Sequence, residues 1–428
     1  MSLDQLAKEN QQLRLAINEL KIINDIATAI SSTQPLEKVI DQIVFKCIKH
    51  LEAEEGTISL LEEGSEAQQF HTMIRHQDST IGKVPIKLDD RLKGWMLNNK
   101  SILLSNNIRD DPRFKFLDEE AYSFRSILCV PLMIKGDLKG YLATFNKKNG
   151  DPFSEEDRRL LSIIGSQSAQ VIENARLYEE EKALISLQEE LRLARDIQLN
   201  LLPKNTPEIP GIQIAATNLP AKSIGGDYYD FLSISYDRLG FCIGDITGKG
   251  MPAAMLMANL QATFRSQVLN VEEPDECLEG TNKLLYRNSE STKFATFFYG
   301  VLNPETGILE YANGGHDAPL LFRDGSAPLF LKATGLLLGA FEDAEYDMAT
   351  ISLQPKDLLL LYTDGITEAK NKNDNEFGLD RLIQLTSEHR QSTASEILDT
   401  ILKEVQEFTN KTPQSDDITL MVIKNDKE

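Results

Sequence analysis

The first 30 residues place apolar side chains at alternating spacings of three and four. The positions in this series are Leu3, Leu6, Asn10, Leu13, Ile17, Leu20, Asn24 and Ala27. A repeat of this kind predicts a coiled-coil helix over residues 1–30, and asparagine at two core positions favours a dimer of fixed register. Because the repeat is short, an amphipathic helix packed against its own domain is the alternative.

From residue 31 to residue 150 the pattern changes to a helix followed by strands. The stretch LEKVIDQIVFKCIKHL has a helical apolar face, whereas EGTISLLEE and SILCVPLMIKGDLKGYLATFNK have strand patterns with a turn at Lys135-Gly136-Asp137. A second helix begins at Ser154, where Asp157 is placed to complete a capping box. These elements predict an α+β domain flanked by long helices.

The second helix continues into the following segment, and Pro203 ends it. Its heptad positions are Leu177, Leu184, Leu187, Leu191, Ala194 and Leu201. This spacing predicts a coiled-coil linker over residues 155–202 that pairs with a second copy of the chain. A continuous helix transmits a twist or a change of register between domains, which a Gly/Ser-rich linker does not. A passive spacer is the alternative.

Strand patterns dominate after residue 203. Two helices interrupt them, PAAMLMANLQATFRSQV and GLDRLIQLTSEHRQSTASEILDTILKEVQEF. The segment FATFFYGVLNPETGILEYANGG predicts a hairpin that turns at Asn-Pro-Glu-Thr-Gly. Strands paired through hairpins, with few helices, favour an antiparallel β-sandwich over residues 203–428.

Composition narrows the classes of function. A chain of 428 residues predicts two or three domains. The formal net charge of −21 argues against nucleic acid or an anionic membrane as a partner, because phosphate binding needs a basic face. The N-terminal sequence lacks the pattern of a signal peptide, and the chain contains no apolar run of about 18 residues. We therefore expect a cytoplasmic protein that does not enter a membrane.

The four cysteines are widely separated along the chain. They are Cys47, Cys129, Cys242 and Cys277, and no two of them form a CxxC pair. This spacing indicates neither a zinc site nor a disulfide framework. We interpret them as small buried apolar residues.

Aspartates stand at four strand ends in the last domain. Asp245 ends the run RLGFCIGD, Asp364 ends DLLLLYTD, Asp416 and Asp417 precede ITLMVI, and Asp227 precedes YYDFLSIS. Each is a turn residue when taken alone, since Asp-Gly is a common turn. Together they predict a cluster of carboxylates. Carboxylates that repel one another are expected where cations neutralise them, and no matching group of Lys or Arg stands beside these motifs.

An all-oxygen ligand set without His or Cys suits a hard divalent cation, Mg²⁺ or Mn²⁺. Asp227 is preceded by two glycines in IGGDYYDF, which allow close approach of the backbone to a charged group. Asp230, three residues further along, fits a turn cap as well as an ion contact.

Two stretches of the chain resemble known families. VPLMIKGDLKGYLATFNK and FSEEDRRLLSIIGSQSAQVIENARLY, in this order, resemble the last strands and terminal helix of a GAF sensory domain, and the resemblance covers residues 31–178. It implies a small-molecule or protein signal.

The motifs GGDYYDF, GDITGKGMPAAM, FATFFYG, NGGHDAP, LYTDGITEA and DDITLMVI follow ARDIQLNLLP in order. They resemble the SpoIIE/RsbU-like branch of the PPM metal-dependent protein phosphatases from Ala194 to Lys424. The resemblance implies a β-sandwich flanked by helices that hydrolyses phosphoserine or phosphothreonine on proteins.

The resemblance also implies the site. Asp227 and Asp245 would bind or bridge two metal ions with the Ile246 carbonyl, Asp364 and Asp416 would complete the pair, and Asp417 would lie close by. A third ion is the alternative. Two divalent ions about 4 Å apart can share a water and lower its pKa, so no protein nucleophile is required. The implied substrate is a phosphorylated anti-sigma-factor antagonist of the partner-switching type.

Two further residues have open roles. Lys249, between Gly248 and Gly250, contacts phosphate or is a solvated turn residue. His316 is a general acid or a structural histidine that holds its loop.

These observations predict a dimeric, signal-controlled serine/threonine phosphatase in which the sensor acts through the 155–202 helix on the helix beside Asp245. The alternative is a non-catalytic sensor and scaffold whose phosphatase-like domain only binds a partner. Nucleotide cyclisation also uses paired aspartates, but the chain has no Gly-rich triphosphate cradle to support it.

Overall fold

The computed structural model describes residues 35–61, 70–77, 90–114, 124–289, 293–324, 326–410 and 412–427, with single positions among the first 21 residues. The predicted coiled coil over residues 1–30 lies almost wholly outside the described residues. The chain divides into two compact units, Met1–Ser186 and Leu187–Glu428. The division falls within one continuous helix of 45 residues, α4 (Glu155–Leu199), inside the range that we predicted for the linker.

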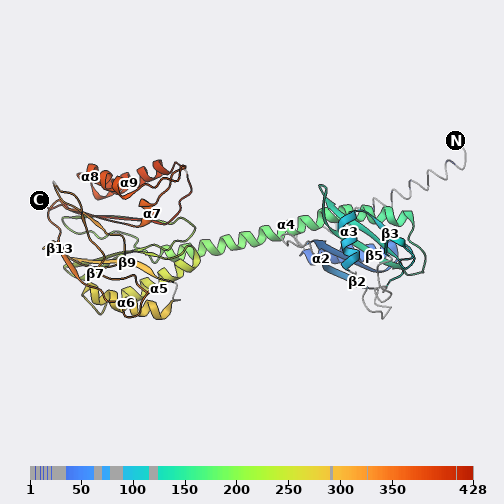
Figure 1. Ribbon diagram of the computed structural model, residues 1–428, viewed down its shortest axis with the longest axis horizontal. Coiled ribbons are helices and arrows are strands. Elements are labelled where there is room, and N and C mark those ends of the chain that lie inside the picture. Colours follow the sequence, from blue (N-terminus) through green and yellow to red (C-terminus); the bar gives the residue numbers. More distant parts are fainter. Residues whose placement is uncertain are drawn as a thin grey trace. The chain divides into compact units, whose positions relative to one another are not determined.

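The first unit is a five-stranded antiparallel sheet with helices (Figure 1). Along the chain its elements are α2 (Leu36–Leu51), β1 (Ala53–Leu61), β2 (Phe70–Gln77), α3 (Asp90–Asn99), β3 (Leu103–Ser105), η1 (Pro112–Phe114), β4 (Ile127–Ile134), β5 (Asp137–Lys147) and the start of α4. The strand order is β2-β1-β5-β4-β3.

Both faces of this sheet are covered, as strand β4 illustrates. Leu128 and Val130 join a core with α2 and the first turns of α4, whereas Ile127 and Cys129 join a second core on the opposite face. This alternation follows from the period of two along a strand. The β4–β5 turn, with positive φ at Lys135 and Gly136, and the Ser154–Asp157 capping box are confirmed.

The second unit is an antiparallel sandwich of two five-stranded sheets. Its elements are β6 (Ile212–Leu219), β7 (Tyr228–Ser235), β8 (Arg238–Ile246), α5 (Met251–Val268), α6 (Pro274–Asn288), β9 (Ala295–Leu302), β10 (Ile308–Gly314), β11 (Leu320–Phe322), β12 (Leu329–Phe330), β13 (Ala349–Ser352), β14 (Leu358–Tyr362), α7 (Asp364–Thr367), α8 (Leu379–His389), α9 (Ala394–Thr409) and β15 (Ile418–Asn425). The sheet orders are β13-β10-β9-β8-β7 and β12-β11-β14-β15-β6. The predicted α+β class and sandwich are confirmed.

Helices cover the outer faces of the sandwich: α5 and α6 pack on the first sheet, and α8 and α9 lie over the second (Figure 1). Strand β14 shows the consequence. Leu359 and Leu361 belong to the core between the sheets, whereas Leu358 and Leu360 belong to the core under α8 and α9. Four consecutive leucines are buried because both faces of the sheet are covered.

Two helix predictions for this unit are wrong. The structure has a further helix, α6, which begins at Pro274, a residue suited to a first helical turn. The single helix expected from GLDRL to VQEF is two helices, α8 and α9. The second starts afresh because Thr393 and Glu396 form a capping box, in which each side chain accepts the other's backbone N–H.

The predicted hairpin between β9 and β10 is confirmed. The Asn303 side-chain oxygen accepts the N–H groups of Glu305 and Thr306, and Gly307 supplies the positive φ that closes the turn. All four cysteines are buried and unpaired, as we predicted. Within the described residues, no helix is at once long and apolar enough to span a bilayer.

Candidate active site

The aspartates at the four predicted strand ends meet at one end of the sandwich. Strands β7 and β8 are antiparallel neighbours, so Asp227, just before β7, lies beside the end of β8, which carries Asp245. In the other sheet, Asp364 follows β14, and Asp416 and Asp417 precede its antiparallel neighbour β15. The start of one strand therefore faces the end of the next in both sheets.

Hydrogen bonds to Asp227 connect the two sheets. Its carboxylate accepts the hydroxyl of Thr363 at 2.8 Å and that of Thr419 at 2.6 Å, and its side chain is buried. The Thr363 N–H also bonds to the Thr419 carbonyl. Neither threonine was predicted from the sequence, because each lies far from Asp227 along the chain and has no distinguishing local pattern.

The two glycines of IGGDYYDF allow the backbone to approach the site closely. A Cβ atom on Gly225 would lie 2.5 Å from Oδ2 of Asp417, and one on Gly226 would lie 3.0 Å from the Ile246 carbonyl oxygen. The Asp417 carboxylate occupies the space beside these glycines. Its Oδ2 accepts the Gly226 N–H, and its Oδ1 accepts the Ala221 N–H at 2.7 Å. A Cβ at Gly225 would therefore displace the Asp417 carboxylate, and a Cβ at Gly226 would press against the Ile246 carbonyl oxygen.

Burial and mutual repulsion raise the pKa of the clustered carboxyl groups. The pKa of Asp245 rises to about 7, first through burial and then through the charge of Asp364. The pKa of Asp364 rises to about 6 through burial and the charge of Asp416. Burial and the charge of Asp245 also hold the pKa of Asp227 well above its usual value. The negative charge of these carboxylates is therefore not fully balanced by positive charge in the site.

One lysine partly supplies that charge. Lys249 Nζ lies 2.8 Å from Oδ2 of Asp416 and donates to the Ser415 carbonyl oxygen at 2.7 Å. The hydrogen bond with Asp416 raises the pKa of Lys249. This ion pair was not among the two roles considered for Lys249, whose side chain is still 45% exposed. The expectation that no cationic side chain stands beside the aspartate motifs is therefore wrong for Lys249. Gly248 and Gly250, which both have positive φ, allow the backbone conformation that brings Lys249 to Asp416.

Asp230 is separate from this cluster. Its buried carboxylate accepts Arg265 Nε at 2.7 Å and Nη2 at 3.1 Å, and the Tyr228 hydroxyl at 2.6 Å. An aspartate paired in this way with a guanidinium is already neutralised. Its role is therefore to anchor α5 to β7 through Arg265.

The donor set fits hard divalent cations by its chemistry. It is made of oxygen atoms, Asp227 and Asp417 are buried, and neighbouring charges help to raise the pKa of Asp227, Asp245 and Asp364, so positive charge would be stabilised there. Over the described residues, however, no three of the Asp, Glu, His and Cys side chains stand at ion-binding spacing. Asp227, Asp416 and Asp417 are instead held by threonine hydroxyls, Lys249 and backbone N–H groups.

Comparison with known proteins decides the family. A model of stage II sporulation protein E (SpoIIE) matches residues 235–426, and a GAF-domain model matches residues 33–173. Phosphoserine phosphatase RsbU of Bacillus subtilis (strain 168) is 31% identical over 258 residues, which are 58% of this chain and 74% of RsbU. The chain belongs to the SpoIIE family. It is a serine phosphatase with a GAF domain on its N-terminal side, and both predicted resemblances are confirmed.

Other relatives agree with this assignment. Phosphoserine phosphatase RsbP of Bacillus subtilis (strain 168) is 26% identical over 243 residues, covering 56% of this chain and 58% of RsbP. The solved SiaA-PP2C domain of Pseudomonas aeruginosa has a TM-score of 0.51 and 21% identity, covering 56% of this chain and 98% of that domain. This second likeness shows a shared fold.

His316 of this SpoIIE-family phosphatase is a buried loop residue. The Nδ1 atom of its ring lies 2.8 Å from the Thr296 hydroxyl oxygen. Its backbone N–H donates to the Asn313 side-chain oxygen at 2.8 Å. Burial lowers the pKa of the imidazole to about 4, so the ring is neutral at pH 7. An imidazolium is therefore scarce at neutral pH, and the geometry favours the structural alternative over the general acid.

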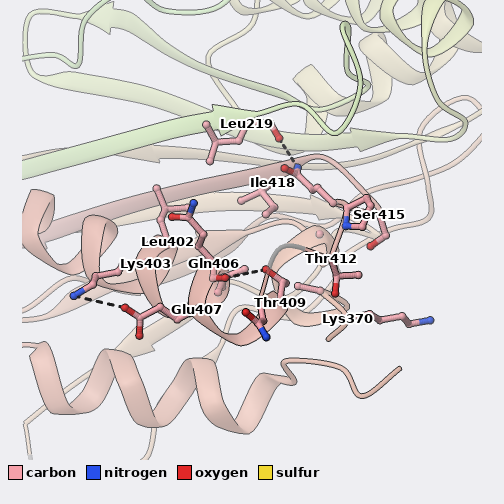
Figure 2. Close-up of a pocket in the computed structure, with 16 residues that line it drawn as sticks. Leu219, Lys370, Leu402, Lys403, Gln406, Glu407, Thr409, Thr412, Ser415 and Ile418 are labelled. Atoms are coloured by element: carbon pink, nitrogen blue, oxygen red, sulfur yellow. Dashed lines mark hydrogen bonds and ion pairs between the residues drawn. The ribbon is translucent and has the colours of Figure 1, made fainter. Parts of the chain in front are cut away.

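A groove borders the site of the SpoIIE-family phosphatase (Figure 2). Its volume is about 840 Å³, and it is lined by the C-terminal half of α9 and the segment that leads to β15. Gly365 and Ser415 belong to its wall, and they are the sequence neighbours of Asp364 and Asp416. Figure 2 shows Lys403 and Glu407 paired on α9 along the same wall. The carboxylate cluster is thus adjacent to an open surface.

Proposed function

We propose that this chain is a signal-regulated serine/threonine phosphatase that removes the phosphoryl group from a partner protein with the help of two divalent ions. The meeting of Asp227, Asp245, Asp364 and Asp416 at one end of the sandwich carries the proposal, and the pKa is raised for the first three of these carboxyl groups. Bound ions would supply a water of lowered pKa and positive charge opposite the phosphoryl oxygens.

The residues of this chain would prepare that site in specific ways. Asp227, Asp245, Asp364 and Asp416 would hold the ions, with the Ile246 carbonyl and Asp417 beside them. Thr363 and Thr419 orient the Asp227 carboxylate. Lys249 would compete with an ion for Oδ2 of Asp416, because its ammonium group lies 2.8 Å from that oxygen.

The metal requirement is tested with the purified full chain and a phosphoserine peptide. We expect phosphate release with Mn²⁺ or Mg²⁺, its loss after treatment with EDTA, and its return when either ion is restored, because the four carboxylates lack a sufficient counter-charge of their own. The measurement is inorganic phosphate released over time. Turnover that persists in EDTA would contradict the proposed ion-dependent site.

We propose a phosphorylated anti-sigma-factor antagonist as the natural substrate. The similarity to the phosphoserine phosphatases RsbU and RsbP supports this substrate class. A phosphorylated antagonist and a phosphoserine peptide of unrelated sequence, compared at equal concentration, separate a partner-specific enzyme from a general one. No release from either substrate, with Mn²⁺ present and in every state of the sensor, would refute the enzymatic proposal.

We also propose that the chain is a homodimer whose GAF domain passes a small-molecule or protein signal along α4. The apolar seam of that helix supports this, since Leu177, Leu184 and Leu187 are each half exposed or more in the single chain. Such side chains at heptad spacing are typical of a coiled coil.

The apolar seam of α4 predicts different effects for two single substitutions, one on the seam and one beside it. Leu184→Asp is expected to convert the dimer to a monomer, because it places a charge in the coiled-coil core. Ile185→Asp is the matched control: Ile185 is 54% exposed and Leu184 60%, but only Leu184 is on the seam. Sedimentation velocity gives the mass of each. A monomeric wild type, or equal effects of the two variants, would contradict this interface.

A further inference from the structure

One side chain ties the last turn of α4 to the glycine pair ahead of Asp227. The Gln198 amide nitrogen donates to the Gly225 carbonyl oxygen at 2.7 Å, and the Gly225 N–H donates to the Gln198 amide oxygen at 3.1 Å. The two residues are 27 positions apart in the sequence. A primary amide that donates and accepts in this way fixes both the distance and the orientation of the backbone it contacts.

Gly225 is the point where this contact reaches the carboxylates. Its Cα packs so closely on Asp417 that a Cβ would lie 2.5 Å from Oδ2. The following N–H, that of Gly226, donates to the same oxygen, and Asp227 comes next in the chain. A displacement of Gly225 therefore moves the backbone that holds Asp417 and precedes Asp227.

The neighbours of Gln198 on α4 have no comparable contact. Arg192 pairs with Asp196 inside the helix, and the Asn200 amide donates to the Asp196 carbonyl just beyond the helix end. Among the described residues from 187 to 199, no other side chain hydrogen-bonds outside the helix. Gln198 is thus the polar link between this part of α4 and the loop.

We infer that Gln198 is a positioning residue that couples α4 to the active site by holding Gly225 against Asp417. The inference rests on the proposed function and adds a route to it: the sequence suggested that α4 acts on α5, whereas this contact leads directly to the loop before Asp227. A rotation of α4 about its axis carries the Gln198 amide away from Gly225 and releases that loop. Gln198 acts through the Gly225 backbone, to which both of its amide hydrogen bonds are made.

The first test measures the loop itself. In the full chain, hydrogen–deuterium exchange of a peptide that spans Gly225 to Asp227 is expected to be about tenfold faster in Gln198→Ala, because two backbone hydrogen-bonding groups lose their partner. Asn200→Ala is the matched control, since the Asn200 amide bonds only to Asp196 of its own helix end. Equal exchange in the two variants would overturn the inference.

The second test asks whether the hydrogen bonds or the volume of the side chain matter. Gln198→Glu keeps the shape but sets a carboxylate oxygen against the Gly225 carbonyl, so it is expected to fail as Gln198→Ala does. Both variants should lower kcat about tenfold with KM unchanged and weaken Mn²⁺ binding in calorimetry, whereas Asn200→Ala should match the wild type. Normal behaviour of Gln198→Glu would show that the residue only fills space and would overturn the inference.

The calorimetric arm separates this inference from the proposed function. If the wild type binds Mn²⁺ but releases no phosphate, the proposed activity fails while the effect of Gln198 on Mn²⁺ affinity and on exchange still decides the inference. If the wild type is active and Gln198→Ala is unchanged in exchange, in Mn²⁺ affinity and in kcat, only the inference fails.

Discussion

Replacing Asp364 by asparagine is expected to lower phosphate release by about a hundred- to a thousandfold, while the fold is kept. Asp364 begins α7 at the end of β14, and its carboxyl pKa is raised to about 6 by burial and by the charge of Asp416. Asparagine has nearly the same size but carries no charge, so the site loses one of the negative groups that would attract divalent ions.

A second measurement makes this prediction specific. In EDTA, Asp364→Asn should be at least as stable to heat as the wild type, because removing one of several repelling carboxylates relieves the folded state. Asp399→Asn, an exposed aspartate on α9, is the matched control and should change neither activity nor stability. A loss of activity that accompanies unfolding would leave the role of Asp364 unsupported.

The same variant separates the enzyme from the scaffold that we considered as the alternative. If the chain only binds its partner, Asp364→Asn retains its full effect on that partner. If it acts by catalysis, the variant still binds the phosphorylated partner but no longer releases phosphate. Partner binding and phosphate release are therefore measured on the same preparation.

The sequence was informative where a chemical requirement produced a local pattern. Asp245 and Asp364 each end an apolar run, and Asp416 precedes one, so their positions at strand ends were predictable. That the ends converge follows from antiparallel pairing. The glycines before Asp227 were predicted to allow close approach, and the structure identifies Asp417 and the Ile246 carbonyl as the groups approached.

The residues that the sequence did not reveal act through partners remote in the chain. Thr419 is 192 positions from Asp227, and Gln198 is 27 positions from Gly225, so no local spacing marks either contact. Lys249 is different, because it stands within an aspartate motif. Its partner Asp416 precedes a strand of the other sheet, and only the folded sandwich brings the two residues together.

In the fold, too, features set by local sequence were predictable and features set by distant contacts or single caps were not. Hairpin turns such as 303–307 are local, so the sandwich could be inferred from them. Helix α6 was missed because its segment is largely polar and its apolar face is narrow. Cys277, Leu278 and Leu285 are buried, and most of the rest is polar. The break between α8 and α9 depends on one cap at Thr393, which a continuous apolar pattern conceals.

Replacing Arg265 by alanine is expected to destabilise the second unit by about 2–4 kcal/mol. Asp230 is 1% exposed and accepts two hydrogen bonds from this guanidinium, so the variant leaves a buried carboxylate with only Tyr228 and the Phe231 N–H as donors. We expect a smaller loss of unfolding free energy than for a fully buried ion pair, because the Arg265 side chain is 45% exposed. Asp230→Asn should cost less, about 1 kcal/mol, since it leaves behind an arginine that water can solvate.

The asymmetry between these two variants is the decisive observation, because a simple surface ion pair would give equal and small losses. Arg287→Ala is the control of that kind: its pair with Glu342 is exposed on both sides, and it should cost at most about 0.5 kcal/mol. Urea unfolding of the full chain is followed by circular dichroism, while fluorescence of the single tryptophan, Trp95, reports on the first unit alone. Arg265→Ala should shift the dichroism transition of the second unit and leave the Trp95 transition in place. A shift of both transitions, or a loss equal to that of Arg287→Ala, would show that Asp230 does not depend on Arg265.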